Sequence, residues 1–181
     1  MRSIFIGMLF VFVNINIIIG SSLIGLVPTF FGYLCILGGL SELKGYSTCF
    51  TKATPWVKGM VIYSAFCYAM NLLGAGAVDN PYGLLFGSIL GISLTIISLF
   101  IAYNIIMGIK DIETTKVQNL NSVQLYSTWK MLAVLSIGAS VFIFVPVLNL
   151  ACAIAGFVVA VYYIFIFNKT KKLFYIENPT T

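Results

Sequence analysis

The stretch Pro81–Ile109, PYGLLFGSILGISLTIISLFIAYNIIMGI, contains no charged residue. It occupies most of a charge-free run of 30 residues between Asp79 and Lys110. A helix needs about 20 apolar residues to cross a hydrocarbon core about 30 Å thick. The run is therefore long enough for one transmembrane helix, and its composition predicts a membrane protein.

Three further runs lack charge, with 39 residues after Arg2, 20 after Lys58 and 38 after Lys130. By the same criterion they accommodate two, one and two spans. The prediction is an all-α integral membrane bundle of six helices in a single domain, 1–181. The first span is expected to be uncleaved, because Gly20-Ser21-Ser22 is not a signal-peptidase site and a second apolar segment follows directly. The spans are expected at about 4–20, 23–41, 55–75, 82–109, 128–145 and 147–167.

The overall composition agrees with this class. The chain is 60% hydrophobic and 8% charged, whereas a soluble domain carries about 25% charged residues. Its net charge of +5 is interpreted as a topology signal, because no basic run alternates with aromatic residues outside the spans. No nucleic-acid partner is expected, and the lipid bilayer is the expected environment.

The positions of the basic residues predict the orientation. Six spans place the N-terminus, the connections 42–54 and 110–127, and the C-terminal tail on one side of the membrane. The opposite side holds only Asp79. By the positive-inside rule both termini are cytoplasmic, in the cytoplasmic (inner) membrane. All ten basic residues fall on the cytoplasmic side: Arg2, Lys44, Lys52, Lys58, Lys110, Lys116, Lys130, Lys169, Lys171 and Lys172.

Turn and interface signals mark the ends of the spans. Thr54-Pro55 and Asn80-Pro81 are predicted helix starts, since proline at the first helical position loses no hydrogen bond. A further turn is expected at Val145-Pro146. Trp56 and Trp129 are expected to be interfacial anchors.

An internal repeat is suggested by the pattern Y-x-x-I-x-[G/N], which begins at Tyr33, Tyr103 and Tyr163 near the ends of the second, fourth and sixth spans. The repeat units would be three αα-hairpins, 1–49, 50–118 and 119–181. Shared constraints at one membrane face explain the same pattern without a repeat, because interfacial tyrosine and a terminal glycine are both common.

No ionisable residue lies near a span centre, so a transmembrane proton relay is not expected. The neutral polar residues have two interpretations. They form interhelical hydrogen bonds, worth about 0.6 kcal/mol each, or they line a polar cavity for a neutral solute. The residues considered for such a cavity are Asn14, Asn71, Asn104, Tyr33, Tyr103 and Tyr163.

A glycine stripe at Gly83, Gly87 and Gly91 predicts close helix packing, because successive small residues let another backbone approach. The packing partner is a helix of this chain or a second copy.

No catalytic, metal or cofactor site is predicted. The chain has no histidine, and none of its cysteines form a CxxC pair. The residues of a Ser–His, paired-aspartate or HExxH protease are missing. Cys35, Cys49, Cys67 and Cys152 are interpreted as small apolar residues.

The segment 27–40, VPTFFGYLCILGGL, followed by Phe50-Thr51-Lys52-Ala53-Thr54-Pro55, resembles small uncharacterised polytopic membrane proteins of low-GC Gram-positive bacteria. Their pattern is L-P-[DN]-x-[IF]-G-Y-[IL]-L-I-x-x-G-L and then F-x-K-A-x-P. Thr29 stands where that pattern has an acid. The resemblance implies a bacterial cytoplasmic membrane and transfers no activity.

The sequence is compatible with two functions. The first is a non-catalytic accessory, immunity-type or assembly component that works through helix contacts with another membrane protein or with itself. The second is a solute-binding or permeation protein for a small neutral molecule. An intramembrane enzyme is disfavoured because no constellation of acid, base or nucleophile is present.

Overall fold

The computed structural model describes residues 1–12, 16–19, 22–25, 29–72, 81–116, 119–142 and 145–177. Side chains are described for the same residues except 16–19, 22–25, 71–72, 81–88, 146 and 177. This described part contains six helices and one two-stranded antiparallel hairpin. In chain order they are α1 (Arg2–Phe12), β1 (Asn16–Ile19), β2 (Ser22–Gly25), α2 (Thr29–Leu43), α3 (Thr48–Leu72), α4 (Pro81–Lys116), α5 (Ser122–Val141) and α6 (Pro146–Glu177).

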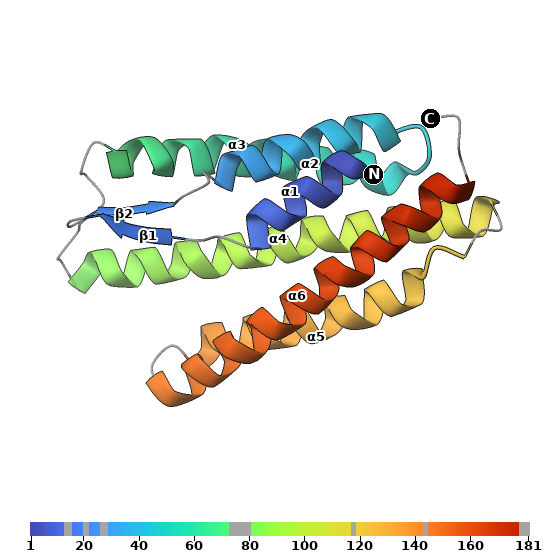
Figure 1. The fold of residues 1–181 in the computed structure, drawn as a ribbon. Coiled ribbons are helices and arrows are strands. Elements are labelled where there is room, and N and C mark those ends of the chain that lie inside the picture. The colour runs from blue at the N-terminus through green and yellow to red at the C-terminus, as the bar shows by residue number, and fades with distance from the viewer. Residues whose placement is uncertain are drawn as a thin grey trace.

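Consecutive helices alternate in direction and pack on one another along the chain, and α1 also packs on α6 (Figure 1). The N-terminus and the end of α6 therefore lie at the same end of the bundle (Figure 1). We call this the basic end; it comprises the start of α1, residues 44–47, the end of α4, residues 119–121 and the end of α6. Each basic residue lies at this end or in the half of its helix nearer to it.

The prediction of unbroken helices at 4–20 and 23–41 is wrong. α1 ends at Phe12, α2 begins at Thr29 and the segment between them holds the hairpin, with Asn16 paired to Gly25 and Ile19 to Ser22. The sequence explains the change. Ile17, Ile18 and Ile19 are β-branched, which favours strands, and only Gly20-Ser21 separates the strands, a length typical of hairpins.

The predicted helix start at Thr54-Pro55 is also wrong. α3 begins at Thr48 and contains Pro55 in its interior. Phe50 and Ala53 are fully buried, so packing favours helix over this turn. The Thr54 hydroxyl donates to the Phe50 carbonyl at 2.9 Å. Thr54 therefore bonds within the helix and is not its N-cap residue.

The starts of α4 at Pro81 and of α6 at Pro146 agree with the predicted turns. Both helices continue well beyond the predicted spans, and α5 begins at Ser122, before the expected start at 128. The extensions are stabilised by packing, because Ile112, Leu125 and Phe174 are almost completely buried. The segment 110–127, expected to be a polar connection, is therefore largely helical.

Two of the described helices are long and apolar enough to cross a membrane, judged by length and composition. They are Ile89–Lys116 within α4 and Val147–Ile176 within α6, with mean hydropathies of 2.2 and 2.5. Only 28% and 22% of the respective apolar windows are buried inside the protein. α1 and α2 are apolar but shorter.

Among the described side chains, the buried core lies mainly toward the basic end. It includes Ile4, Leu40, Phe50, Ile109 and Tyr163. Toward the opposite end, large apolar side chains are exposed on α5 and α6. They include Val134, Ile137, Val141, Val147, Leu150, Ile154 and Phe157.

Glycines of α1 and α2 allow the closest helix contact that we identify. A Cβ atom on Gly7 would lie 2.8 Å from the backbone nitrogen of Ile36, and one on Gly39 would lie 2.8 Å from that of Ile4. Gly32 and Gly39 are seven residues apart, which places them on one face of α2. At these glycines the backbones of α1 and α2 are in direct contact.

Candidate functional site

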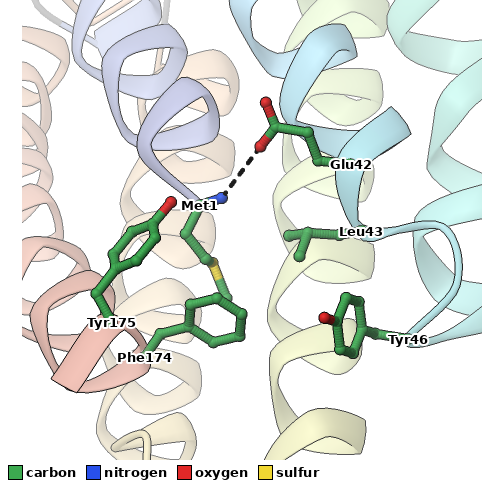
Figure 2. A pocket seen from close by; sticks show the side chains of 6 residues that line it. All are labelled: Met1, Glu42, Leu43, Tyr46, Phe174 and Tyr175. Atoms are coloured by element: carbon green, nitrogen blue, oxygen red, sulfur yellow. Dashed lines mark ion pairs between the residues drawn. The ribbon is translucent and has the colours of Figure 1, made fainter. Parts of the chain in front are cut away.

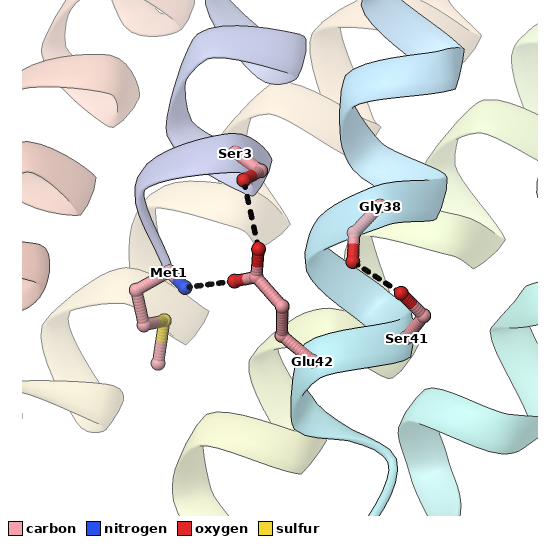
Figure 3. A network of polar contacts seen from close by, with 5 residues as sticks. All are labelled: Met1, Ser3, Gly38, Ser41 and Glu42. Atoms are coloured by element: carbon pink, nitrogen blue, oxygen red, sulfur yellow. Dashed lines mark hydrogen bonds and ion pairs between the residues drawn. The ribbon is translucent and has the colours of Figure 1, made fainter. Parts of the chain in front are cut away.

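Three acidic side chains at the basic end each connect separate parts of the chain. Glu42, at the end of α2, lies 3.6 Å from the Met1 amino group and accepts a hydrogen bond of 3.3 Å from the Ser3 hydroxyl (Figure 3). Burial lowers the pKa of the Met1 amino group, and the Glu42 carboxylate acts in the opposite direction. Glu42 therefore connects α2 to the start of α1.

Asp111 on α4 holds the connection between α2 and α3. Its Oδ2 accepts a hydrogen bond from the Ser47 hydroxyl and lies 3.6 Å from Cys49 Sγ. The Ser47 oxygen in turn accepts the Cys49 backbone N–H at 3.1 Å. This arrangement satisfies a backbone donor in the first turn of α3.

Glu113 on α4 caps α5. Its two carboxylate oxygens accept the backbone N–H groups of Leu120 and Ser122, each at 3.1 Å. The N-cap residue, Asn121, adopts a left-handed conformation with φ 56° and makes no capping hydrogen bond with its side chain. A carboxylate at this position also interacts favourably with the helix dipole. The Thr170 hydroxyl donates to the Leu120 carbonyl at 2.9 Å and adds α6 to the connection.

A pocket of about 330 Å³ lies beside these connections at the basic end (Figure 2). Tyr46 faces it from the turn after α2, and Phe174 and Tyr175 face it from the end of α6 (Figure 2). The rings of Tyr46 and Phe174 are edge to face, with centroids 6.4 Å apart. Met1, Glu42 and Leu43 complete the lining.

Two cationic side chains lie over tyrosines of this pocket. The Arg2 guanidinium carbon is 5.1 Å from the ring centroid of Tyr175, and Lys116 Nζ is 4.8 Å from that of Tyr46. Both distances are within the range of cation–π attraction. The pocket therefore has aromatic walls and two positive charges beside it. The Glu42 carboxylate in its lining contacts the Met1 amino group and the Ser3 hydroxyl.

Two apolar grooves flank α5. One, of about 340 Å³, lies between α4 and α5 and is lined by Ile96, Leu99, Phe100, Tyr103, Trp129 and Ala133, among others. The other, of about 400 Å³, lies between α5 and α6 and includes Lys130, Val134 and Val159. The Trp129 indole donates to the Leu99 carbonyl at 3.2 Å, which fixes the aromatic end of the first groove.

The three tyrosines of the predicted polar cavity have different neighbours. Tyr33 is buried, and the Ser98 side chain lies near its hydroxyl. Tyr103 packs against Tyr126 and Trp129, with centroids 6.3 and 5.2 Å away.

Tyr163 is fully buried against Phe12 and Phe167, with centroids 5.8 and 6.3 Å away. Its hydroxyl has no hydrogen-bond partner among the residues that the structure describes.

Of the asparagines, Asn104 is buried and donates its amide N–H to the Phe100 carbonyl of its own helix at 2.8 Å. Asn14 lies outside the described residues, and the Asn71 side chain is not described. Asn149 donates to the Ala139 carbonyl at 3.0 Å and so links the start of α6 to α5. This contact joins two helices, whereas the hydroxyls of Ser93, Thr95 and Ser140 bond to carbonyls of their own helices.

The predicted glycine stripe shows no close contact where it is described. A Cβ atom on Gly91 would meet no atom within 4 Å, so no neighbouring helix of the described chain approaches it. The surroundings of Gly83 and Gly87 lie outside the described side chains. Close contacts occur instead at Gly7, Gly32 and Gly39, and at Gly108, where an added Cβ would lie 2.5–2.8 Å from three ring atoms of Phe50.

Sequence reasoning missed the pocket at the basic end. Its aromatic residues lie in segments interpreted as the connection 42–54 and the basic and polar C-terminal tail. A signal was available in the tail, because Tyr163, Phe167, Thr170 and Phe174 recur at helical spacing. All four are buried, and this face extends α6 toward the pocket.

Comparison of the chain with protein-family models, curated protein sequences and solved structures finds no match. Within the described residues, no group of three or more His, Cys, Asp or Glu side chains could hold a metal ion.

Proposed function

We propose that this chain is a six-span, non-catalytic protein of the bacterial cytoplasmic membrane that works through helix contacts with another membrane protein, as an accessory, immunity-type or assembly component. The observation that carries the proposal is the exposure of large apolar side chains along α5 and α6. Val147 is 79% exposed, Val134 70% and Phe165 69%. An apolar surface of this kind requires lipid or a protein partner.

The hydroxyl groups on the exposed helix faces support a lipid environment. Ser93 and Thr95 donate to the carbonyls of Ile89 and Gly91, four residues earlier, each at 2.9 Å. A hydroxyl that bonds to its own helix needs no water, so it can face hydrocarbon at low cost.

The six crossings require the hairpin as well as the helices. α1 and α2 have 11 and 15 residues, about 17 and 23 Å at 1.5 Å per residue, whereas the hydrocarbon core is about 30 Å thick. β1 and β2 lie beyond these helices, on the side away from the basic end (Figure 1). β2 contacts α3, and a strand at membrane depth must be covered in this way. The first two crossings are therefore proposed to include the hairpin.

The basic end supports the proposed orientation. The positive-inside rule places an excess of Lys and Arg on the cytoplasmic side, and the basic residues are all nearer to this end of the bundle. Both termini are accordingly proposed to be cytoplasmic.

A non-catalytic role is supported by how the acids are used. Glu42, Asp111 and Glu113 each hold separate parts of the chain together through the contacts described above. A general acid or base must instead reach a substrate. The alternative, solute binding or permeation, draws no support from Asn104, because this amide bonds to its own helix.

The test is extraction followed by site-specific photocrosslinking in native membranes. The chain should remain in the membrane after carbonate washing. A benzophenone side chain at Val158, which is 61% exposed on α6, should capture one protein at a constant ratio, whereas the same probe at Ile62, 71% exposed on α3, should not. Release by carbonate would contradict the membrane assignment. Capture of lipid alone at both positions would contradict the helix-contact function. A small molecule retained through purification would favour the alternative.

A further inference from the structure

The groove between α5 and α6 lies along the seam of two helices that pack side by side (Figure 1). Its volume is about 400 Å³, and it is lined by Lys130, Met131, Val134 and Leu135 of α5 and by Val159 of α6. Met131 and Val134 are 59% and 70% exposed, so the apolar wall is accessible from outside the bundle. Sites for small ligands have volumes of about 300–1,000 Å³, and the groove is therefore large enough to hold part of an elongated ligand.

Lys130 places a positive charge at the end of the groove that is nearer to the basic end. Its Nζ lies 4.5 Å from the ring centroid of Tyr126, which is one turn closer to the start of α5. The lysine stem therefore lies along the groove and its ammonium lies beyond the apolar wall, as expected of a lysine at a membrane interface. None of the five lining residues named above carries a carboxylate. An ammonium in this position is suited to bind a phosphate group.

A hydrogen bond links α5 to α6 beyond this end of the groove. The Gln124 amide donates to the Tyr162 hydroxyl oxygen at 3.2 Å. Gln124 lies seven residues before Met131, and Tyr162 lies three residues after Val159, so each continues the groove face of its helix toward the basic end. Because the Tyr162 oxygen accepts this bond, its own proton remains able to donate. A second donor for a polar headgroup is therefore present beside Lys130.

The dimensions of the groove favour a hydrocarbon chain over a helix. α5 and α6 approach each other closely, because a Cβ atom on Gly156 would lie 4.0 Å from the Cβ of Leu135. A helix about 10 Å across would place only about one turn within the volume of 400 Å³. An acyl chain is thinner and can lie along the seam. A phospholipid therefore matches both parts of the groove, with a chain for the apolar wall and a phosphate for the ammonium.

We propose that this groove binds one phospholipid of the inner leaflet, with the phosphate at Lys130 and one acyl chain along the apolar side chains of the seam. In the proposed orientation the basic end is cytoplasmic, so the charged end of the groove faces the cytoplasmic interface and the apolar end faces the bilayer interior. Trp129, the neighbour of Lys130, is the interfacial anchor expected from the sequence. The inference rests on the membrane placement of the proposed function and adds a specific ligand class to it.

The test uses the full chain in phosphatidylglycerol vesicles that include a phosphatidylglycerol with a diazirine group in one acyl chain. Light attaches this probe to the residues beside it, and mass spectrometry of the peptides locates the attachment. Labelling should concentrate on residues 131–135 and on Val159. It should exceed the labelling of Ile62 and Phe66 on α3, which are similarly exposed at 71% and 61%. Equal labelling of the two surfaces would indicate contact with bulk lipid only and would overturn the proposal.

The role of the lysine is tested with matched variants. Lys130→Gln should lower the labelling of the groove about fivefold, as expected for the loss of one cation near the membrane surface. Lys58→Gln removes the same charge from an exposed position of α3 and should leave this labelling unchanged, and Lys130→Arg should retain it because the charge is kept. Equal labelling in Lys130→Gln and Lys58→Gln would overturn the phosphate contact.

If Lys130→Gln fails to fold, competition on the unchanged chain still tests the proposal. Unlabelled phosphatidylglycerol should compete with the probe about fivefold better than diacylglycerol, which has the same chains and no phosphate. Equal competition would contradict the phosphate contact. A benzophenone at Val134 that captures a protein in native membranes would assign the groove to a partner helix and would also overturn the proposal.

Carbonate extraction of every sample separates this inference from the proposed function. A chain that is released fails the proposed function. A chain that resists extraction but shows no preferential labelling of the groove fails only this inference.

Discussion

The carbonyl oxygen of Gly32 on α2 lies 2.4 Å from the position that a Cβ atom on Gly7 of α1 would occupy. The same face of α2 continues to Gly39, which lies against the backbone of Ile4. Tyr33, Ile36 and Leu40 are buried beside these glycines. Five residues specified by the quoted pattern are therefore packing positions of α2, whereas Phe31 and Leu34 of the same pattern are exposed. Phe50 and Ala53, from its second part, are also buried.

Alanine substitution at two adjacent glycines of α2 should change the stability of the fold in opposite directions. Gly39→Ala should destabilise the fold by about 1–3 kcal/mol, since the new methyl group must displace the α1 backbone. Gly38→Ala should stabilise it by about 0.5–1 kcal/mol, because its Cβ would meet no atom within 4 Å and alanine is the better helix former. Thermal unfolding in detergent measures both. Similar midpoints for the two variants would show that α1 does not pack at this distance.

Removal of the Glu113 carboxylate should loosen the start of α5. Glu113→Ala leaves the N–H groups of Leu120 and Ser122 without their acceptor, at a cost of about 0.5–2 kcal/mol. Hydrogen exchange at these two amides should accelerate, whereas the amides of the α5 interior should stay protected. Glu113→Gln is the matched variant, because it keeps one acceptor oxygen and should give an intermediate effect. Unchanged exchange in Glu113→Ala would mean that another group caps the helix.

Removal of the hydroxyl group should change the stability of the protein differently at two buried tyrosines. Tyr163→Phe should leave stability unchanged or raise it, because the hydroxyl has no partner among the described residues and an unsatisfied buried donor is costly. Tyr33→Phe should lower stability by up to about 1 kcal/mol, because the Tyr33 hydroxyl has a polar neighbour in Ser98. Denaturant or thermal unfolding compares them. Destabilisation by Tyr163→Phe as large as that by Tyr33→Phe would indicate a partner for the Tyr163 hydroxyl.

The Met1 amino group should titrate below its ordinary value of 8.0, because burial lowers its pKa. Glu42→Gln should lower the pKa further, since the carboxylate that favours the charged amine is removed. In the window between the folded pKa and 8.0, the unfolded chain binds more protons, so stability should rise with pH. Carbon-13 NMR of the dimethylated amine follows the titration. A pKa at or above 8.0 in the folded protein would contradict the burial of this group.

The orientation can be tested by cysteine labelling. After replacement of the four native cysteines, an impermeant maleimide added to intact cells should label a cysteine at Asp79 and not one at Lys116. Labelling of both positions after permeabilisation is the control. Labelling of Lys116→Cys in intact cells would reverse the proposed orientation.

Several features of the fold could be predicted from local spacing. Long charge-free runs indicated helices, and Pro81 and Pro146 marked the starts of α4 and α6. The hairpin at 16–25 was missed because apolar length alone does not distinguish a helix from paired strands, although the isoleucines and Gly20-Ser21 carried the signal. The helix start predicted at Thr54-Pro55 was wrong because the burial of Phe50 and Ala53 outweighed the local signal for a helix start.

The linear order of charges and apolar residues by itself determined the helical class and the gathering of the basic residues toward one end, because helix length and chain reversal are set by spacing along the chain. Only the tertiary structure decided which glycines meet a neighbouring backbone and which rings line a pocket. Those contacts depend on how each helix is rotated about its axis against its neighbours. No atom lies within 4 Å of a Cβ added to Gly91, whereas one added to Gly39 would lie against the backbone of Ile4. Tyr46 likewise contacts Phe174, which is distant in sequence. These differences arise because the packing energy of the whole bundle selects one rotation for each helix.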